Sequence, residues 1–193
     1  MRTVFFDVDT QIDFLFPAGA LYVPGAERIL PAIAKLNQYA ASHGILVVST
    51  MDAHAENDPE FRDWPAHCVV GTAGQAKPAS TLLDRRAVLS SQACGMQLAE
   101  VDQLLVEKQW LDCFRNPNLN PMLAELTADR FVVYGVVTEI CVRFAALGLL
   151  ATGERVEVVT DATKNLSEEG RERFFAEFVD GGGKLISVAE ICG

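Results

Sequence analysis

The hydrophobic and polar positions of the chain alternate between short apolar runs and longer segments with helical spacing. Runs rich in β-branched residues predict strands at Thr3–Phe6, Ile45–Thr50, Leu104–Val106, Phe131–Val137, Val156–Thr160 and Leu185–Val188. Helices are predicted at the segment that carries Ile29, Leu30, Ile33, Leu36 and Tyr39 and ends at Gly44, and at Leu119–Leu126, Cys141–Ala151 and Ser167–Val179. This alternation predicts an α/β fold with a parallel sheet covered on both faces.

The segment from Asp52 to Leu98 interrupts the alternation. It is rich in proline, glycine, alanine and histidine and has no long periodic stretch. A long irregular segment inside a compact domain is more often functional than not, so we expect it to contribute to a site. We interpret Gly181–Gly183 as a turn before the last strand, because no helix follows it as a phosphate-binding loop requires.

Composition and charge narrow the function classes. The 193 residues are 50% apolar and 22% charged, which suits a single domain over residues 1–193. The net charge of -10, without any basic cluster, argues against nucleic acid or an anionic membrane surface as a partner. The apolar run at the N-terminus is too short for a signal peptide, and no stretch has the length of a membrane span, so we expect a soluble, cytoplasmic protein. Five widely spaced cysteines favour a reduced compartment over a disulfide framework.

Three residues suggest nucleophilic chemistry. Asp9, Lys108 and Cys141 each follow an apolar run that is predicted to be a strand, so a parallel sheet could bring them to one edge. A carboxylate and an ammonium beside a thiol can withdraw its proton and hold the thiolate. The N–H groups of a helix start at Cys141 would favour a thiolate and could hold an oxyanion. Each residue alone also has an ordinary interpretation, as a cap, an exposed lysine or a core cysteine.

A second group of residues suggests a metal site. Asp52 and His54 are separated by one residue at a predicted strand end, and Glu60 and His67 follow. Two of the three histidines of the chain lie here. A carboxylate and two imidazoles can converge on one divalent ion, although an Asp-x-His pair in a loop is common without a metal.

These residues form part of a familiar pattern. Its motifs are Asp9-Thr10-Gln11-Ile12-Asp13-Phe14, Asp52-Ala53-His54, Trp64-Pro65-Ala66-His67-Cys68-Val69-Val70-Gly71-Thr72-Ala73-Gly74, Lys108, and Gly135-Val136-Val137-Thr138-Glu139-Ile140-Cys141-Val142-Arg143. With these motifs in order, the chain resembles the isochorismatase-like cysteine hydrolases over nearly its whole length. Within that superfamily it looks most like the nicotinamidases (pyrazinamidases). The resemblance implies a doubly wound fold with six parallel strands.

The resemblance also implies a catalytic mechanism. It assigns Asp9, Lys108 and Cys141 to a triad, with a cis peptide bond between Val136 and Val137. The N–H groups of Val137 and Cys141 would form the oxyanion hole. The thiolate would attack a carboxamide carbon, and Asp9 would pass the thiol proton to departing ammonia and then activate the water that hydrolyses the thioester.

Ligands and substrate contacts follow from the same resemblance. Asp52, His54 and His67 match the positions that hold the metal in nicotinamidases, where the metal binds the pyridine nitrogen of the substrate. Zinc suits this site best, and iron and manganese are alternatives. Glu60 falls where the fourth ligand is often histidine or glutamate, and Asp58 or Asp63 could compete for that role. The substrate contacts would come from Phe14, Trp64, Val136 and Ile140.

The leading hypothesis is a metal-dependent amidohydrolase that converts nicotinamide to nicotinate and ammonia in NAD salvage. Isochorismatases and carbamoyl amidases of the superfamily generally lack the metal pattern, which is the main reason for this choice. Two alternatives stay open: a cysteine hydrolase acting on another small amide or on isochorismate, and a catalytically idle member that binds a partner. The habit of the family suggests a homo-oligomer.

Overall fold

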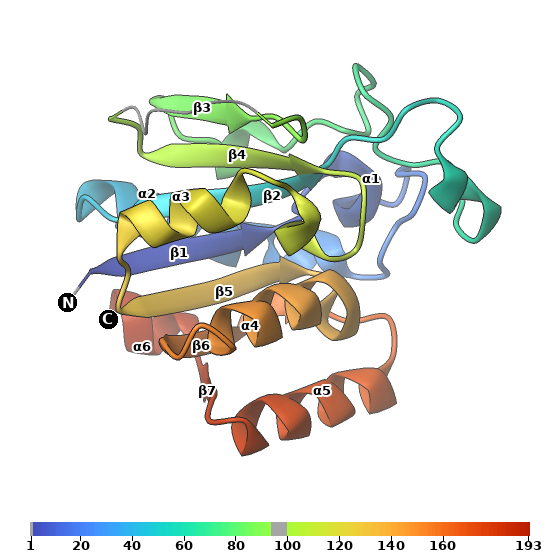
Figure 1. Cartoon of the computed structure of the whole chain (residues 1–193). Coiled ribbons are helices and arrows are strands. Elements are labelled where there is room, and N and C mark those ends of the chain that lie inside the picture. The colour runs from blue at the N-terminus through green and yellow to red at the C-terminus, as the bar shows by residue number, and fades with distance from the viewer. Residues whose placement is uncertain (1, 94–99) are drawn as a thin grey trace.

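The protein is described by a computed structural model that covers residues 2–93 and 100–193. Its centre is a parallel sheet of seven strands in the order β3-β4-β2-β1-β5-β6-β7 (Figure 1). The strands are β1 (Thr3–Val8), β2 (Leu46–Asp52), β3 (Arg86–Leu89), β4 (Gln103–Lys108), β5 (Arg130–Val136), β6 (Arg155–Lys164) and β7 (Lys184–Ile186). β1 lies in the middle, and the chain winds outward from it in both directions.

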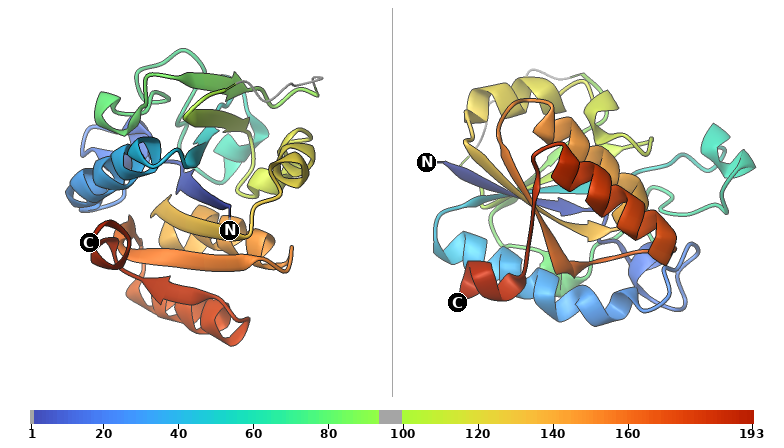
Figure 2. Two further views of the ribbon diagram at one scale, coloured as in Figure 1. Left: turned by 90° about the vertical axis from the view of Figure 1, so that its left-hand side faces the viewer. Right: turned by 90° about the horizontal axis from the view of Figure 1, so that it is seen from below.

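Helices cover both faces of the sheet, as expected for a doubly wound fold (Figure 2). The α-helices are α1 (Ile12–Leu15), α2 (Leu30–Ser42), α3 (Leu119–Leu126), α4 (Arg143–Leu150), α5 (Glu168–Asp180) and α6 (Val188–Cys192). Short 3₁₀ turns are η1 (Ala26–Ile29), η2 (Pro59–Arg62), η3 (Ala79–Thr81) and η4 (Cys113–Arg115), and η5 (Thr138–Val142) is a π-helical turn. None of the helices in the described ranges is long and apolar enough to cross a membrane.

The alternation of side chains along β1 builds a hydrophobic cluster on each face. Val4, Phe6 and Val8 pack with the buried residues of α3, α4 and α5, whereas Phe5 packs with those of α2. Successive side chains of a strand point to opposite faces, so a central strand covered on both sides is apolar at most of its positions. This requirement explains why the sheet strands appear in the sequence as continuous apolar runs.

The prediction of six strands is wrong by one. The seventh, β3, lies in the segment that we predicted to be irregular. It has only four residues at the edge of the sheet, and among them Leu89 is buried while Arg86 and Val88 are exposed. Because an edge strand this short buries so little apolar surface, its sequence lacks the continuous apolar run that identified the other six.

Two other boundaries differ from the prediction. The last strand was expected to run to Val188, but Ser187 instead begins α6, where its side chain and that of Glu190 form a capping box. The helix expected to begin at Cys141 is preceded by η5, so Cys141 lies inside a π-helical turn and α4 follows it. Single π turns of this kind are frequent at functional sites.

Gly135 determines how closely β1 and β5 approach each other. Its φ angle is +119°, and a Cβ atom at this position would lie 2.1 Å from the carbonyl oxygen of Val8. The pairing of β5 with β6 also shifts register between Val133 and Gly135. Only glycine combines this backbone conformation with such close contact. The carboxyl ends of β1 and β5 can therefore bring Asp9 and Cys141 together.

Candidate active site

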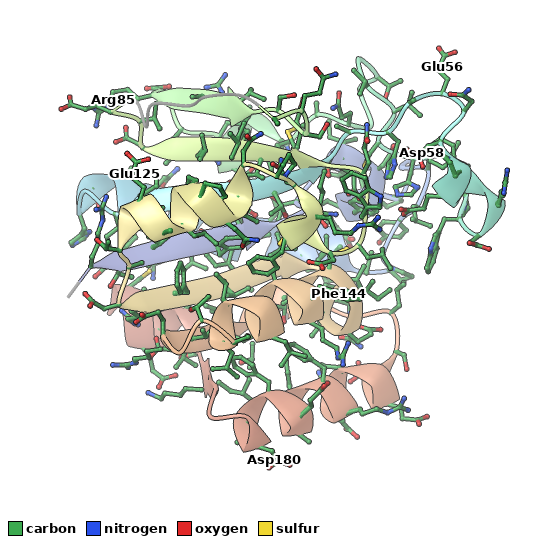
Figure 3. All side chains as sticks on the ribbon, in the orientation of Figure 1. Glu56, Asp58, Arg85, Glu125, Phe144 and Asp180 are labelled. Atoms are coloured by element: carbon green, nitrogen blue, oxygen red, sulfur yellow. The ribbon has the colours of Figure 1, made fainter. Side chains whose placement is uncertain are left out.

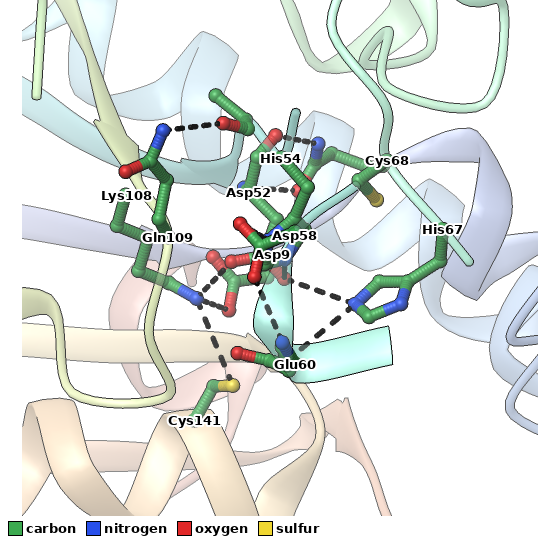
Figure 4. A network of polar contacts seen from close by, with 12 residues as sticks. Asp9, Asp52, His54, Asp58, Glu60, His67, Cys68, Lys108, Gln109 and Cys141 are labelled. Atoms are coloured by element: carbon green, nitrogen blue, oxygen red, sulfur yellow. Dashed lines mark hydrogen bonds and ion pairs between the residues drawn. The ribbon is translucent and has the colours of Figure 1, made fainter. Parts of the chain in front are cut away.

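The predicted site residues meet at the carboxyl edge of the sheet. Asp9 follows β1, Asp52 ends β2, Lys108 ends β4, and Cys141 lies in η5 after β5. β4, β2, β1 and β5 are neighbours in the sheet, and Asp52 and Lys108 are paired in register. Figure 4 shows these side chains turned toward one another, and the two labelled termini of Figure 1 lie at the opposite end. Ligand sites of open α/β sheets occur at this edge.

Lys108 is the centre of this group. Its Nζ lies 2.9 Å from Oδ2 of Asp9 and 3.9 Å from Sγ of Cys141, and it also contacts Oδ1 of Asp52. The side chain is only 1% exposed. Burial opposes its charge, but the carboxylates of Asp52 and Asp9 outweigh burial and hold the pKa of Lys108 well above its usual range. Lys108 is therefore a buried ammonium group.

The thiol of Cys141 lies beside that ammonium, in surroundings that favour its protonated form. Burial raises the pKa of the Cys141 thiol well above its ordinary value, and Lys108 opposes this effect while Asp9 and Asp52 add to it. The expectation that Lys108 and a helix terminus hold a resting thiolate is therefore too simple for the free protein. Asp9, which is hydrogen-bonded to the thiol, is the group that can take its proton.

The backbone and Thr50 fix the carboxylate of Asp9. Asp9 has a positive φ of 50°, and its N–H donates to the carbonyl oxygen of Thr50 at 3.1 Å. The hydroxyl of Thr50 donates to Oδ1 of Asp9 at 2.7 Å. Oδ2 is therefore the oxygen that faces Lys108. This geometry fixes the carboxylate of Asp9 beside the ammonium, where it could carry a proton to and from the thiol.

The second predicted group also converges. One ligand atom each of Asp52, His54 and His67 lies within 4.8 Å of the others, and all three residues are buried. Nε2 of His54 lies 4.0 Å and Nε2 of His67 lies 3.8 Å from Oδ2 of Asp52. Nδ1 of His67 is 2.7 Å from the carbonyl oxygen of Pro65, to which it donates when Nε2 is free to bind.

The three candidates for a fourth ligand occupy different places. Glu60 faces the group, with Oε1 at 4.0 Å from Nε2 of His67. Asp58 lies on the other side of the imidazole of His54, where its Oδ2 is 3.0 Å from Nδ1. Asp63 ends η2 and is not part of the group that the described residues form. Glu60 is therefore the candidate that the geometry favours.

The donor atoms of this group fit a transition-metal ion. Nε2 of His54 is a buried nitrogen without a hydrogen-bond partner within the described part of the chain. Burial raises the pKa of Asp52 to about 6, against the effect of Lys108 and with a further contribution from Asp9. Two imidazole nitrogens and a carboxylate oxygen are donors that zinc, iron and manganese accept.

A cavity lies beside the two groups and is lined by residues of both. Its wall includes Cys141, Asp52, His67 and three of the predicted substrate contacts, Phe14, Trp64 and Ile140. The fourth predicted contact, Val136, is fully buried in the core and does not line the cavity. The peptide bond between Val136 and Val137 is cis, as the resemblance implied, and Val137 does reach the wall. A mostly apolar lining with a few polar groups is the usual setting for a small organic ligand.

Several residues around the site were not singled out in the sequence. Five of them add apolar or aromatic surface to the cavity wall: Leu21, Tyr22, Val23, Leu111 and Leu166. Gln11 holds the peptide of Asp52 from both sides, because its Oε1 accepts from Asp52 N at 2.7 Å and its Nε2 donates to Asp52 O at 2.8 Å. Loop residues of this kind have no periodic pattern, so no sequence signal pointed to their roles.

Asp13 links three segments around the site. Its carboxylate accepts hydrogen bonds from the N–H groups of Cys68 at 2.7 Å and of Ala20 at 2.9 Å. A Cβ atom on Gly74 would overlap this carboxylate, which explains a glycine in the motif after His67. Asp13 therefore supports the loop that carries His67, and it is not one of the acids that face the thiol.

The other cysteines have no comparable setting. Cys68 and Cys113 are buried, and burial raises the pKa of both thiols. Cys192 lies in α6, away from the carboxyl edge of the sheet. Cys94 lies outside the described residues. Core packing accounts for Cys68 and Cys113, in line with the interpretation of most cysteines as small hydrophobic residues.

A parallel α/β sheet that presents a thiol, an ammonium and a carboxylate at its carboxyl edge is typical of hydrolases with a cysteine nucleophile. Residues 3–190 match the Isochorismatase domain model, and the chain belongs to the isochorismatase family. It is 27% identical over 207 residues to the nicotinamidase of Escherichia coli, covering 95% of this chain and 93% of that protein. These relatives indicate an amidohydrolase.

A solved structure and a second relative are also similar to this chain. The structure of the pyrazinamidase of Pyrococcus horikoshii in complex with zinc matches with a TM-score of 0.82 and 29% identity, over 97% of this chain and 99% of that one. A probable inactive nicotinamidase of Arabidopsis thaliana is 24% identical, over 87% of this chain and 83% of that protein. The chain has similar sequence identity to a nicotinamidase and to a probable inactive one. Sequence identity therefore does not decide whether this chain is active, and substitutions of its own residues are needed to test activity.

The protonated state of the thiol gives the first testable prediction. Because burial raises the pKa of Cys141, we expect slow alkylation by iodoacetamide at pH 7.5 in the metal-free, substrate-free protein. Below the pKa, the thiolate fraction and the rate should rise about tenfold per pH unit, without a plateau up to pH 9. Peptide mass spectrometry reports the labelling of Cys141. Fast labelling that is independent of pH would contradict this assignment.

Proposed function

We propose that this chain is a metal-dependent cysteine amidohydrolase that converts nicotinamide to nicotinate and ammonia. The main support for the proposal is that one cavity is lined both by Cys141 and by Asp52 and His67 of the candidate metal-binding group. The thiol is 3.9 Å from the ammonium of Lys108, which also binds Asp9. A small amide in this cavity would meet a nucleophile at one end and a ring-binding group at the other.

In the proposed first half-reaction, Asp9 takes the proton of Cys141 as Sγ attacks the carboxamide carbon. The carbonyl oxygen becomes an oxyanion, which the backbone N–H groups of Val137 and Cys141 stabilise. Asp9 then gives its proton to the amide nitrogen, the C–N bond breaks, and ammonia leaves. The acyl group remains on Cys141 as a thioester. The ammonium of Lys108 offsets the negative charge that passes between Asp9 and the thiol.

In the second half-reaction, a water molecule replaces ammonia in the cavity. Asp9 accepts a proton from this water as its oxygen attacks the thioester carbon. When the tetrahedral intermediate collapses, the C–S bond breaks and the proton returns to the sulfur. Nicotinate is released, and Cys141 is again a thiol. The same carboxylate acts as base and as acid in both halves, which requires the fixed position that Thr50 gives it.

Asp52, His54, His67 and Glu60 would hold a divalent ion in this proposal. When bound, the ion supplies a Lewis-acid site for the pyridine nitrogen and so orients the ring. The zinc complex of the Pyrococcus horikoshii pyrazinamidase supports zinc as the first candidate, before iron and manganese. Phe14 and Trp64, both on the cavity wall, would contact the faces of the ring.

Ammonia release from nicotinamide tests the proposed activity. We expect the purified protein to release ammonia, to lose this activity after treatment with a chelator, and to regain it with zinc, iron or manganese. The physical reason is that the ring loses its orienting ligand when the ion is removed. A coupled assay for ammonia provides the measurement. If no ion supports release, another small amide or isochorismate becomes the better substrate hypothesis, and nicotinamide is excluded.

Substitution of the nucleophile and the proton carrier tests the mechanism. Cys141→Ala removes the only bond-forming atom of the scheme, so turnover should fall by roughly 10⁴-fold or more. Asp9→Asn keeps the size of the side chain but cannot carry a proton, and should cost roughly 10²- to 10⁴-fold in kcat. Cys192→Ser, in α6, is the control and should keep full activity. Full activity of Cys141→Ala would exclude the thioester route.

A further inference from the structure

Asp58 contacts the imidazole of His54 at the nitrogen that does not face the metal-binding group. Figure 3 places Asp58 in the segment after β2, near the carboxyl edge of the sheet. Its Oδ2 lies 3.0 Å from Nδ1 of His54, an ion-pair contact that is short enough for a hydrogen bond although its angles are not those of a well-aligned one. Nε2 of the same ring lies 4.0 Å from Oδ2 of Asp52. His54 is fully buried, so the proton on its ring must be placed by the protein and not by water.

The carboxylate of Asp58 is itself held in place. Its Oδ1 accepts the N–H of Glu60 at 2.9 Å and so caps η2, and its own N–H donates to Ala55 O at 3.1 Å. The turn that it caps carries Glu60, whose Oε1 is 4.0 Å from Nε2 of His67. One side chain therefore touches His54 with one oxygen and fixes the position of Glu60 with the other.

We propose that Asp58 is a positioning residue that keeps His54 protonated at Nδ1 and leaves the lone pair of Nε2 free for a metal ion. The inference rests on the proposed function in that a metal ion is the ligand for which this lone pair is kept free. Asp58 acts through His54 and Glu60 and is not itself a ligand, because both of its oxygens are already engaged. Pro65 has the matching role for His67 through its carbonyl oxygen.

Asp58→Asn reverses the polarity of one contact at nearly constant size. If the amide oxygen keeps the N–H of Glu60, the amide nitrogen must face His54 and donate to Nδ1. The imidazole proton then moves to Nε2, which can no longer bind a cation. If the amide turns over, His54 keeps its acceptor but the cap of η2 is lost. A carboxylate is thus the side chain that satisfies both neighbours at once.

The tautomer of His54 can be measured directly in the metal-free protein. The chain has three histidines, so long-range ¹H–¹⁵N correlation spectra can be assigned with single substitutions. We expect the neutral form of His54 to carry its proton on Nδ1 in the wild-type protein and on Nε2 in Asp58→Asn. Asp58→Ser, which keeps a capping oxygen but is too short to reach His54, should also lose the Nδ1–H form. A wild-type His54 protonated at Nε2 would overturn the inference.

Metal affinity provides the second readout. Titration of metal-free protein with zinc in a competing chelator should show about 10- to 100-fold weaker binding for Asp58→Asn and Asp58→Ser than for the wild type. Asp63→Asn, at the other end of η2, is the matched control and should bind as the wild type does. Equal affinity of the Asp58 variants and the wild type would overturn the inference.

The metal-dependent function and the positioning role of Asp58 can be tested separately. A wild-type protein that binds no divalent ion would refute the metal-dependent function, and the tautomer measurement would still decide what Asp58 does to His54. Thermal unfolding of each metal-free variant separates positioning from folding. We expect Asp58→Ser to melt close to the wild type because its cap is retained. A loss of zinc affinity that merely followed a loss of folded protein would count against the positioning role.

Discussion

The site depends on the contacts that the buried ammonium group of Lys108 makes with its neighbours. The ammonium contacts the carboxylates of Asp9 and Asp52 and the thiol of Cys141, and all four side chains are buried. Removing one partner of a buried ion pair leaves an uncompensated charge, at a cost of about 3–5 kcal/mol. The cation therefore makes two buried carboxylates tolerable in one place. Each carboxylate belongs to a different half of the site, since Asp9 faces the thiol and Asp52 faces the two histidines.

The topology of the sheet explains why these residues can meet at all. β4, β2, β1 and β5 are consecutive in space but far apart in the sequence, and their parallel direction puts every carboxyl end at the same edge. Gly135 allows the last residues of β1 and β5 to approach closely. The irregular segment after β2 then closes one side of the site, where Glu60 of η2 and Trp64, which follows η2, line the cavity.

The sequence predicted the parts of the molecule that have a strong periodic or chemical signal. Apolar runs identified six of the seven strands, and the position of Asp9, Lys108 and Cys141 after such runs predicted their convergence.

β3 was missed because an exposed edge strand of four residues buries little apolar surface. The π turn at Cys141 and the bonds of Gln11 to Asp52 depend on tertiary contacts, so local sequence could not specify them. The burial that raises the pKa of the Cys141 thiol also has no sequence signal, since burial is a property of the whole fold. The single domain, the cytoplasmic location and the homo-oligomer stay predictions.

The proposed mechanism requires a covalent bond between the substrate and Cys141. The most direct test is mass spectrometry of the protein after acid quenching during turnover of nicotinamide, followed by peptide mapping. If a thioester forms on Cys141, the peptide that contains Cys141 should carry a nicotinoyl group during turnover. This group should be absent once the substrate is exhausted. Ammonia release without any acyl group on Cys141, or with the acyl group on another residue, would contradict the proposed mechanism.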